Sequence, residues 1–228
     1  MFDQHVRPAT LCRRWMGFGL SLSLALSACT LGTSEPTIPA TPASENNEKV
    51  EDINELTSQS QITFTGIGPI QIGMTVAEAE AAANIELIVR YFDYEGTAEP
   101  SRCAYARPSA GPPELALMVI DDRIARIDIS SLTRQEVDGQ SVAVEVESSQ
   151  ITTPEGIGLW ASEADVLAAY PAAEVTLHPY VEGHYLTVTD PNPPYHSLIF
   201  ETNANQDNQV MNFRSGRSPE VQWIEDCS

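Results

Sequence analysis

The chain has 228 residues and carries 32 acidic against 12 basic side chains, a formal net charge of −20. Nucleic-acid binders that use a basic groove, and proteins that dock on anionic lipid through a basic patch, need clustered Lys and Arg, so this balance excludes both classes. Hydrophobic residues make up 42% of the chain, enough to build a core, so the chain as a whole is not disordered.

Residues 1–28 predict a bacterial secretory signal peptide. Basic side chains, among them Arg13 and Arg14, precede an apolar stretch at 16–28 that is too short to span a bilayer as a helix. This stretch ends in Leu26-Ser-Ala-Cys29, which resembles the lipobox of bacterial lipoproteins. The resemblance implies cleavage before Cys29 and its acylation, with palmitate among the acyl chains that anchor the protein. The alternative is an ordinary signal peptide in which this cysteine occurs by chance.

The region from the lipidated Cys29 to residue 61 predicts a flexible tether. It is rich in Thr, Ser, Pro, Glu and Asn and contains no aromatic residue. Such a composition buries too little apolar surface to offset the entropy of ordering the chain. We therefore expect the folded part to begin at Ile62.

From Ile62 onward, short apolar runs of strand type alternate with turn signals. One of these signals, Asp121-Asp122, predicts a hairpin turn, with a calcium site as the alternative. The expected strands cover residues 115–120, 124–129, 142–146, 175–177, 185–188 and 198–200.

Two stretches resemble each other when Thr75 is aligned with Ser162. Glu78 and Asp165 follow these residues by three positions, so each stretch predicts the capping box of a short helix. Strand-like runs follow both helices. The sequence thus predicts an α+β fold of two tandem units, residues 62–150 and 151–228, each a short helix packed on an antiparallel β-meander. Chance similarity between two common helix starts is the alternative.

The segment Gly73-Met-Thr-Val-Ala-Glu78 resembles the opening of small SmpA/OmlA-type lipoproteins of the outer-membrane barrel-assembly machinery. Tandem copies of that unit resemble the β-lactamase-inhibitor-protein fold. Both resemblances imply binding modules without catalysis. The second copy departs from the pattern at Trp160-Ala161, so the identity of a partner does not carry over.

The cysteines that remain after the signal peptide and the lipobox are Cys103 and Cys227. An even pair in an exported protein predicts a disulfide, here between the C-terminus and the first unit. Two free buried thiols are the alternative. The chain has no Cys-x-x-Cys spacing, which disfavours a metal site.

The densest polar and aromatic cluster consists of His178, Tyr180, His184 and Tyr185. Pro179 excludes a helix there, and a spacing of six residues between the histidines is not a helical ligand pair, so no metal site is predicted. These four residues are candidates for contact with a ligand or a partner. The alternative is a structural role in a tyrosine-rich hairpin.

No nucleophile elbow, P-loop, metalloprotease or dinucleotide motif occurs in the chain. The sequence therefore predicts a protein with no enzymatic activity and no cofactor. We expect a lipoprotein of the bacterial cell envelope, facing the periplasm or the exterior, that binds an envelope protein or acts as a scaffold and contacts the bilayer through Cys29. The strong negative charge predicts an electropositive partner surface. The alternatives are a small-ligand or carbohydrate-binding lipoprotein, an inhibitor of a secreted enzyme, and a hydrolase of unrecognised type.

Overall fold

The computed structural model describes residues 55–91, 102–137, 140–192, 194–225 and 227, all of which lie in the unit Lys49–Ser228. The predicted signal peptide, Cys29 and the tether up to residue 54 lie outside the described residues. Leu56 is only 6% exposed and packs into the main core. The folded part therefore starts before Ile62, where the sequence analysis placed its beginning.

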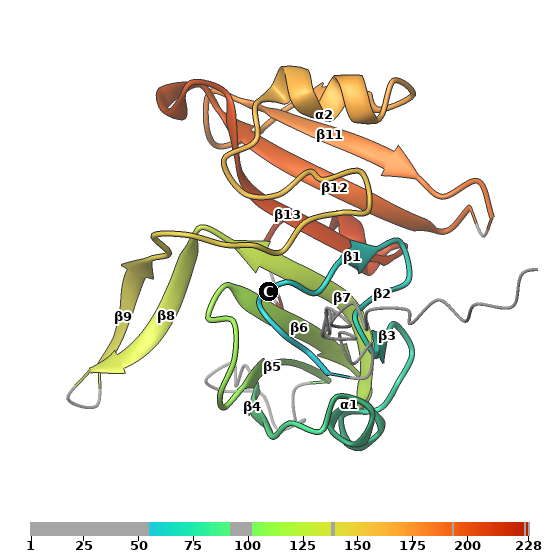
Figure 1. Cartoon of the computed structure of the whole chain (residues 1–228), viewed down its shortest axis with the longest axis vertical. Coiled ribbons are helices and arrows are strands. Elements are labelled where there is room, and N and C mark those ends of the chain that lie inside the picture. The colour runs from blue at the N-terminus through green and yellow to red at the C-terminus, as the bar shows by residue number, and fades with distance from the viewer. Residues whose placement is uncertain (1–54, 92–101, 138–139, 193, 226, 228) are drawn as a thin grey trace, which may run out of the picture. The chain divides into compact units, whose positions relative to one another are not determined.

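One antiparallel sheet of eight strands dominates the unit, in the order β10-β11-β12-β13-β7-β6-β5-β4 (Figure 1). The strands predicted from apolar runs all form, and β6 matches its predicted range in full. The eight strands are β4 (Leu87–Tyr91), β5 (Cys103–Pro108), β6 (Leu115–Ile120), β7 (Arg123–Ser130), β10 (Glu174–Leu177), β11 (His184–Thr189), β12 (His196–Asn203) and β13 (Gln209–Arg217).

The sheet is continuous because β7 pairs with β13, with Ile129 opposite Phe213 and Ile127 opposite Ser215. This pairing joins strands that are far apart in the sequence. It also satisfies the backbone groups that β7 and β13 would otherwise present as open edges. As a result, strands from both halves of the chain form the main sheet and share the main core.

The prediction of an α+β protein built from two tandem units, each a short helix on its own meander, is wrong. The fold is rich in β-structure, and the strands of both expected meanders join in one eight-stranded sheet instead of forming two separate sheets. The two α-helices among the described residues are short, at eight and seven residues. Their buried side chains Ala79, Ala83 and Val166 enter the same hydrophobic cluster as Phe200 and Phe213, so neither helix has a core of its own.

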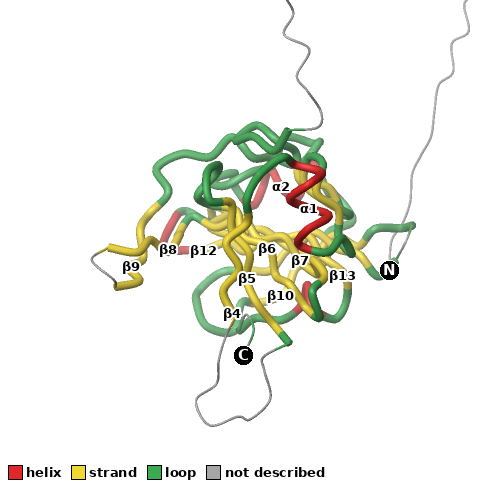
Figure 2. Tube along the Cα trace, turned by 90° about the horizontal axis from the view of Figure 1, so that it is seen from below, coloured by secondary structure: helices red, strands yellow, loops and turns green. Residues whose placement is uncertain are grey.

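The two helices α1 (Val76–Ala83) and α2 (Glu163–Ala169) lie on the same side of the sheet (Figure 2). Both predicted capping boxes are confirmed. The Thr75 hydroxyl accepts a hydrogen bond from the Glu78 amide at 3.2 Å, and the Ser162 hydroxyl accepts one from the Asp165 amide at 3.1 Å. Each carboxylate in turn accepts from the amide of its capping residue, which satisfies donors that the first turn leaves open.

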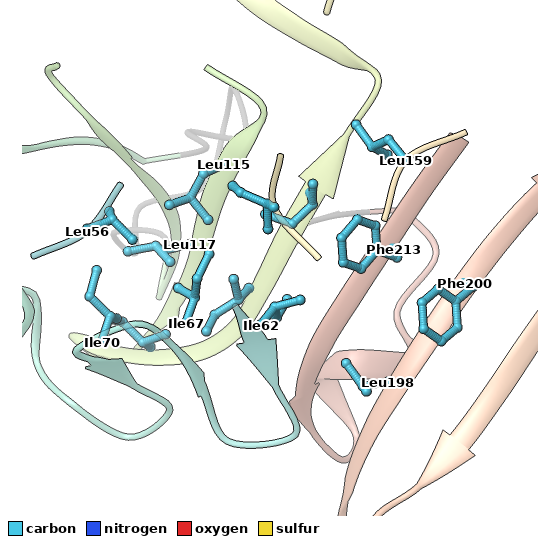
Figure 3. Close-up of a cluster of buried hydrophobic side chains, with 14 of the residues drawn as sticks. Leu56, Ile62, Ile67, Ile70, Leu115, Leu117, Leu159, Leu198, Phe200 and Phe213 are labelled. Carbon is cyan, nitrogen blue, oxygen red and sulfur yellow. The ribbon is translucent and has the colours of Figure 1, made fainter. Parts of the chain in front are cut away.

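The main core lies between the helix-bearing side of the sheet and a small three-stranded sheet (Figure 3). Ile62, Ile67 and Ile70 of the small sheet are fully buried and pack in one cluster with Leu115 and Leu117 of β6. The small sheet therefore covers the part of the core that lies over β6. Its strands are β1 (Ile62–Thr63), β2 (Gly66–Ile67) and β3 (Ile70–Gln71).

A hairpin of β8 (Leu132–Val137) and β9 (Gln140–Glu145) forms a separate two-stranded sheet that projects beside β7 (Figure 1). Its base is fixed by the Thr133 hydroxyl, which donates to the carbonyl of Pro113 at 2.8 Å, and by the Val146 amide, which donates to Ser131 at 2.8 Å. The hairpin is therefore attached at its base.

The disulfide between Cys103 and Cys227 forms, as predicted, and joins β5 to the end of the chain. After β13, the chain passes through the short 3-10 helix η2 (Glu220–Gln222); the other 3-10 helix, η1 (Ala204–Gln206), precedes β13. We call residues 219–225 the C-terminal segment. Its Val221 is fully buried against Tyr185 and Ile199 of the sheet.

Candidate functional site

The side of the sheet opposite the two α-helices carries polar and charged side chains at its centre. On β7, Ile127 and Ile129 point into the main core, so the alternating residues Arg126, Asp128 and Ser130 point to the other side. We call this side the helix-free face. Its central strands therefore bury apolar side chains on one side and hold ionic groups on the other.

Arg126 is the central cation of this face and is only 2% exposed. Its guanidinium forms an ion pair with Asp128 at 2.9 Å and donates to the Tyr105 hydroxyl at 2.6 Å. It also donates to the carbonyls of Glu220 at 3.2 Å and Trp223 at 2.8 Å. A buried charge is tolerated when it is paired and hydrogen-bonded in this way. Arg126 thereby fastens the C-terminal segment to the sheet.

A second buried cation, Arg214, lies on neighbouring β13 and organises a polar chain across three strands. It forms an ion pair with Glu201 on β12 and donates to the carbonyl of Val221 at 2.6 Å. Asn212 donates to the same glutamate at 3.2 Å and accepts from the Ser130 hydroxyl at 2.7 Å. Burial lowers the pKa of Arg214, and the nearby charge of Arg126 lowers it further. These groups form a polar floor whose members hold one another in place.

A cleft of about 590 Å³ opens on the helix-free face; we call it the central cleft. The polar floor is its base, and the hairpin supplies one wall through the side chains of Leu132, Arg134 and Ala143. Arg134 and Ala143 are opposite each other in the hairpin register, so these side chains share one side of it. The remaining lining includes Ile88 and Arg90 of β4, Arg107 of β5, and Ile224 of the C-terminal segment.

Three of the four residues in the predicted polar and aromatic cluster come together on the helix-free face. The ring of His178 stacks on Tyr185 with centroids 4.5 Å apart, and the ring of Tyr180 meets His178 at 6.2 Å. Arg214 lies over the Tyr185 ring at 5.4 Å. Burial lowers the pKa of His178, and Arg214 lowers it further, which favours the neutral imidazole. The Tyr180 hydroxyl donates to Glu225, so this cluster supports the C-terminal segment.

His184, the fourth predicted residue, lies on the other side of the sheet. It precedes Tyr185 on β11, and successive side chains of a strand point to opposite faces. Its Nδ1 is 2.9 Å from the Glu163 carboxylate at the start of α2, and that carboxylate also accepts from the Thr202 hydroxyl at 3.0 Å. The structure thus separates His184 from His178 and gives it a role in attaching α2 to the sheet.

Within the described ranges, no group of three His, Cys, Asp or Glu side chains is arranged to hold a metal ion. Asp121 and Asp122 form the predicted turn between β6 and β7, both with positive φ. Asp121 is engaged by Arg102 in an exposed ion pair. No helix in the part of the chain that the structure describes is long and apolar enough to cross a membrane.

The residues that build the central cleft were missed by the sequence analysis. The signal that was present is a charged or polar residue at every second position of an apolar strand, as at Arg126, Asp128 and Ser130. Arg214 follows the same pattern beside Phe213. This pattern indicates that a sheet face is polar, but it does not show which distant strands complete that face.

No protein-family model and no curated protein matches the chain. Among solved structures, the chain is similar to the uncharacterised protein YfeY from Escherichia coli, with a TM-score of 0.42 and 12% sequence identity, covering 69% of this chain and 99% of that chain. A likeness at this level conveys nothing about function. The resemblance of residues 73–78 to SmpA/OmlA-type lipoproteins therefore stays a prediction.

Proposed function

We propose that the protein is a non-catalytic binding lipoprotein of the bacterial envelope, anchored through acylated Cys29, that holds a partner protein in the central cleft. The observation that carries the proposal is the composition of this cleft. A polar floor, fixed by its own hydrogen bonds, is bordered by exposed apolar side chains such as Ile88 and Leu132, which are 48% and 53% exposed. Protein-binding surfaces are enriched in arginine, combine accessible apolar side chains with groups that hydrogen-bond to the partner, and both kinds of group line this cleft.

The bonding of the floor favours binding over hydrolysis. A serine nucleophile needs a neighbouring base to take its proton. The Ser130 hydroxyl instead donates to the amide oxygen of Asn212 and accepts from the Leu132 amide at 3.1 Å. The carboxylates of Asp128 and Glu201 are each engaged by a buried arginine, Arg126 and Arg214. These groups are arranged to hold a surface rigid.

A site-specific cross-linking experiment tests the binding role. A photoreactive phenylalanine analogue replaces Leu132 on the cleft wall, and in a matched control it replaces Leu167, which is 36% exposed on α2 at the opposite face. We expect irradiation of intact envelopes to yield a discrete protein adduct from the Leu132 position and none from Leu167. No adduct from Leu132, or the same adduct from both positions, would contradict the proposal.

The anchoring role has a separate test at Cys29. Cells grown with labelled palmitate should incorporate the label into the wild-type protein and not into Cys29→Ser, since the acyl chains are attached through this cysteine. The variant should also leave the membrane fraction on lysis. An unlabelled wild-type protein would refute the lipoprotein assignment without affecting the cleft.

A further inference from the structure

The central cleft gathers most of the described positive charge of this acidic protein. Five arginines line it: Arg126 and Arg214 in the floor, and Arg90, Arg107 and Arg134 in the walls. We call the last three the wall arginines. The whole chain has only 12 basic residues and a net charge of −20. Arginines therefore cluster at this cleft, although the chain as a whole is strongly negative.

Among the residues that the structure describes, fewer acidic than basic side chains line the cleft, and the acidic ones are already engaged. They are Glu114, Asp128 and Glu201, against five arginines. Asp128 and Glu201 form ion pairs with the floor arginines. Glu114 is 2% exposed and accepts from the Ser149 hydroxyl at 2.6 Å. The described part of the lining thus has an excess of two positive charges, and the carboxylates in it are held by other groups.

The wall arginines lie where the cleft is open to solvent. Arg134, at the hairpin, is exposed and makes no hydrogen bond or ion pair with any residue that the structure describes. Arg90 on β4 is also exposed. Arg107 is half-buried, and its Nη1 donates to the carbonyls of Pro113 at 3.4 Å and Leu115 at 3.3 Å, which orients its guanidinium over β6. Two walls of the cleft therefore carry cations that face the same space.

Apolar side chains stand beside these cations. Ile88, Leu132 and Ile224 line the cleft and are 48%, 53% and 45% exposed. A small inorganic anion gains nothing from such neighbours, whereas a peptide segment brings both charged and apolar side chains. Arginine also suits carboxylates in particular, because its planar guanidinium donates two parallel hydrogen bonds to one carboxylate.

We infer that the central cleft binds an acidic segment of a partner protein, with its Asp or Glu carboxylates on the wall arginines and its apolar side chains on Ile88, Leu132 and Ile224. This inference rests on the proposed binding function and specifies the partner's chemistry. An acidic partner segment is the opposite of the electropositive partner surface that the net charge predicts. The total of −20 predicts an electropositive partner, but close contact is governed by the charges within about a Debye length, roughly 8 Å at physiological salt.

The probe for the test is a fluorescein-labelled dodecapeptide of alternating Glu and Leu pairs, and the matched peptide has Gln in place of every Glu. Fluorescence polarisation is measured against the folded wild-type chain. We expect saturable binding of the Glu peptide and affinity at least about tenfold lower for the Gln peptide, because charge-assisted hydrogen bonds are lost. Higher salt should weaken binding of the Glu peptide.

Single variants test whether the Glu peptide binds at the central cleft. Arg134→Ala should weaken binding of the Glu peptide by about tenfold, since it removes one guanidinium from the cleft. Arg102→Ala removes the same charge from an exposed site that does not line the cleft, and it should change the affinity by less than about twofold. Because Arg134 has no bonding partner among the described residues, its replacement should leave the unfolding temperature unchanged, and circular dichroism verifies this.

Three results would overturn the inference: equal affinity for the Gln peptide, equal weakening by Arg102→Ala and Arg134→Ala, or no binding of the Glu peptide up to about 1 mM. If one of these occurs while the Leu132 position still cross-links to a protein, the acidic partner is wrong and the binding function stands. If Leu132 gives no adduct, the binding function itself fails. If the chain instead self-associates in a way that Arg134→Ala abolishes, the occupant is a second copy of this chain.

Discussion

Replacement of Arg126 by Met should strongly destabilise the protein and release the C-terminal segment. The substitution keeps an unbranched side chain but removes the guanidinium. Asp128, which is 20% exposed, loses its ion-pair partner. The hydroxyl of Tyr105 and the carbonyls of Glu220 and Trp223 lose a donor.

The magnitude follows from burial. Arg126 is 2% exposed, so water does not replace the lost bonds at the guanidinium's position. Three acceptors at about 1 kcal/mol each, together with a partly buried carboxylate left without its cation, give a loss of about 3–5 kcal/mol in the free energy of unfolding. For a domain of this size, that corresponds to about 6–20 °C in the unfolding temperature.

Urea denaturation followed by circular dichroism measures this loss. Hydrogen exchange at the amides of residues 220–225 reports the C-terminal segment directly and should accelerate more than exchange in β6. Arg126→Lys keeps the charge beside Asp128 but not the fork of donors, so it should fall between wild type and Arg126→Met. Arg102→Met, at an exposed ion pair, should leave the denaturation midpoint unchanged. A loss below about 1 kcal/mol for Arg126→Met would refute the view that this arginine fastens the segment.

Three further predictions concern other parts of the fold. The double variant Cys103→Ser/Cys227→Ser removes a disulfide that joins residues 124 positions apart, so chain entropy predicts a loss of about 4–5 kcal/mol in the free energy of unfolding. In denaturation curves, a reductant should destabilise the wild type but not the variant. Thr75→Ala and Ser162→Ala should each cost about 1 kcal/mol in denaturation experiments. Hydrogen bonds from Thr75 and Ser162 lower the pKa of Glu78 and Asp165. The capping boxes therefore stabilise the fold fully above the ordinary carboxyl pKa, and this stability is lost as the pH falls through the lowered pKa values. In acid titrations, the alanine variants should lose less stability over this pH range than the wild type. Burial, and then Arg214, lowers the pKa of His178, so its stabilising contribution is present above about pH 6.5 and is lost below it; His178→Phe should flatten the decline in stability measured there.

Local features were predictable because short-range chemistry decides them. The capping boxes at Thr75 and Ser162 depend on residues three positions apart, and the structure confirms both. The apolar run at 115–120 forms a strand as predicted. The disulfide between Cys103 and Cys227 followed from counting the cysteines left over in a chain that is predicted to be exported, and the structure contains it.

The candidate site was not predictable to the same degree. His178 and His184 looked like one cluster because they are near each other in sequence, but they lie on opposite faces of the sheet. The alternation of a strand separates His184 from the neighbouring Tyr185, and the position of His178 depends on the turn before β11. The wall arginines are scattered along the chain, at Arg90, Arg107 and Arg134. They line the same cleft because the fold brings their strands β4, β5 and β8 to its border.

The sequence by itself determined the two capping boxes, the apolar runs that form strands, the disulfide partners and an overall charge of −20. Only the tertiary structure decided that β7 pairs with β13, which joined the two expected units in one main sheet with a shared main core. The physical reason is that hydrophobic periodicity specifies which side of a strand is buried but not which distant strand lies beside it. That pairing placed Arg126 beside Arg214 in the polar floor. Together with the wall arginines of β4, β5 and β8, they make the charge of the described cleft lining opposite to that of the chain.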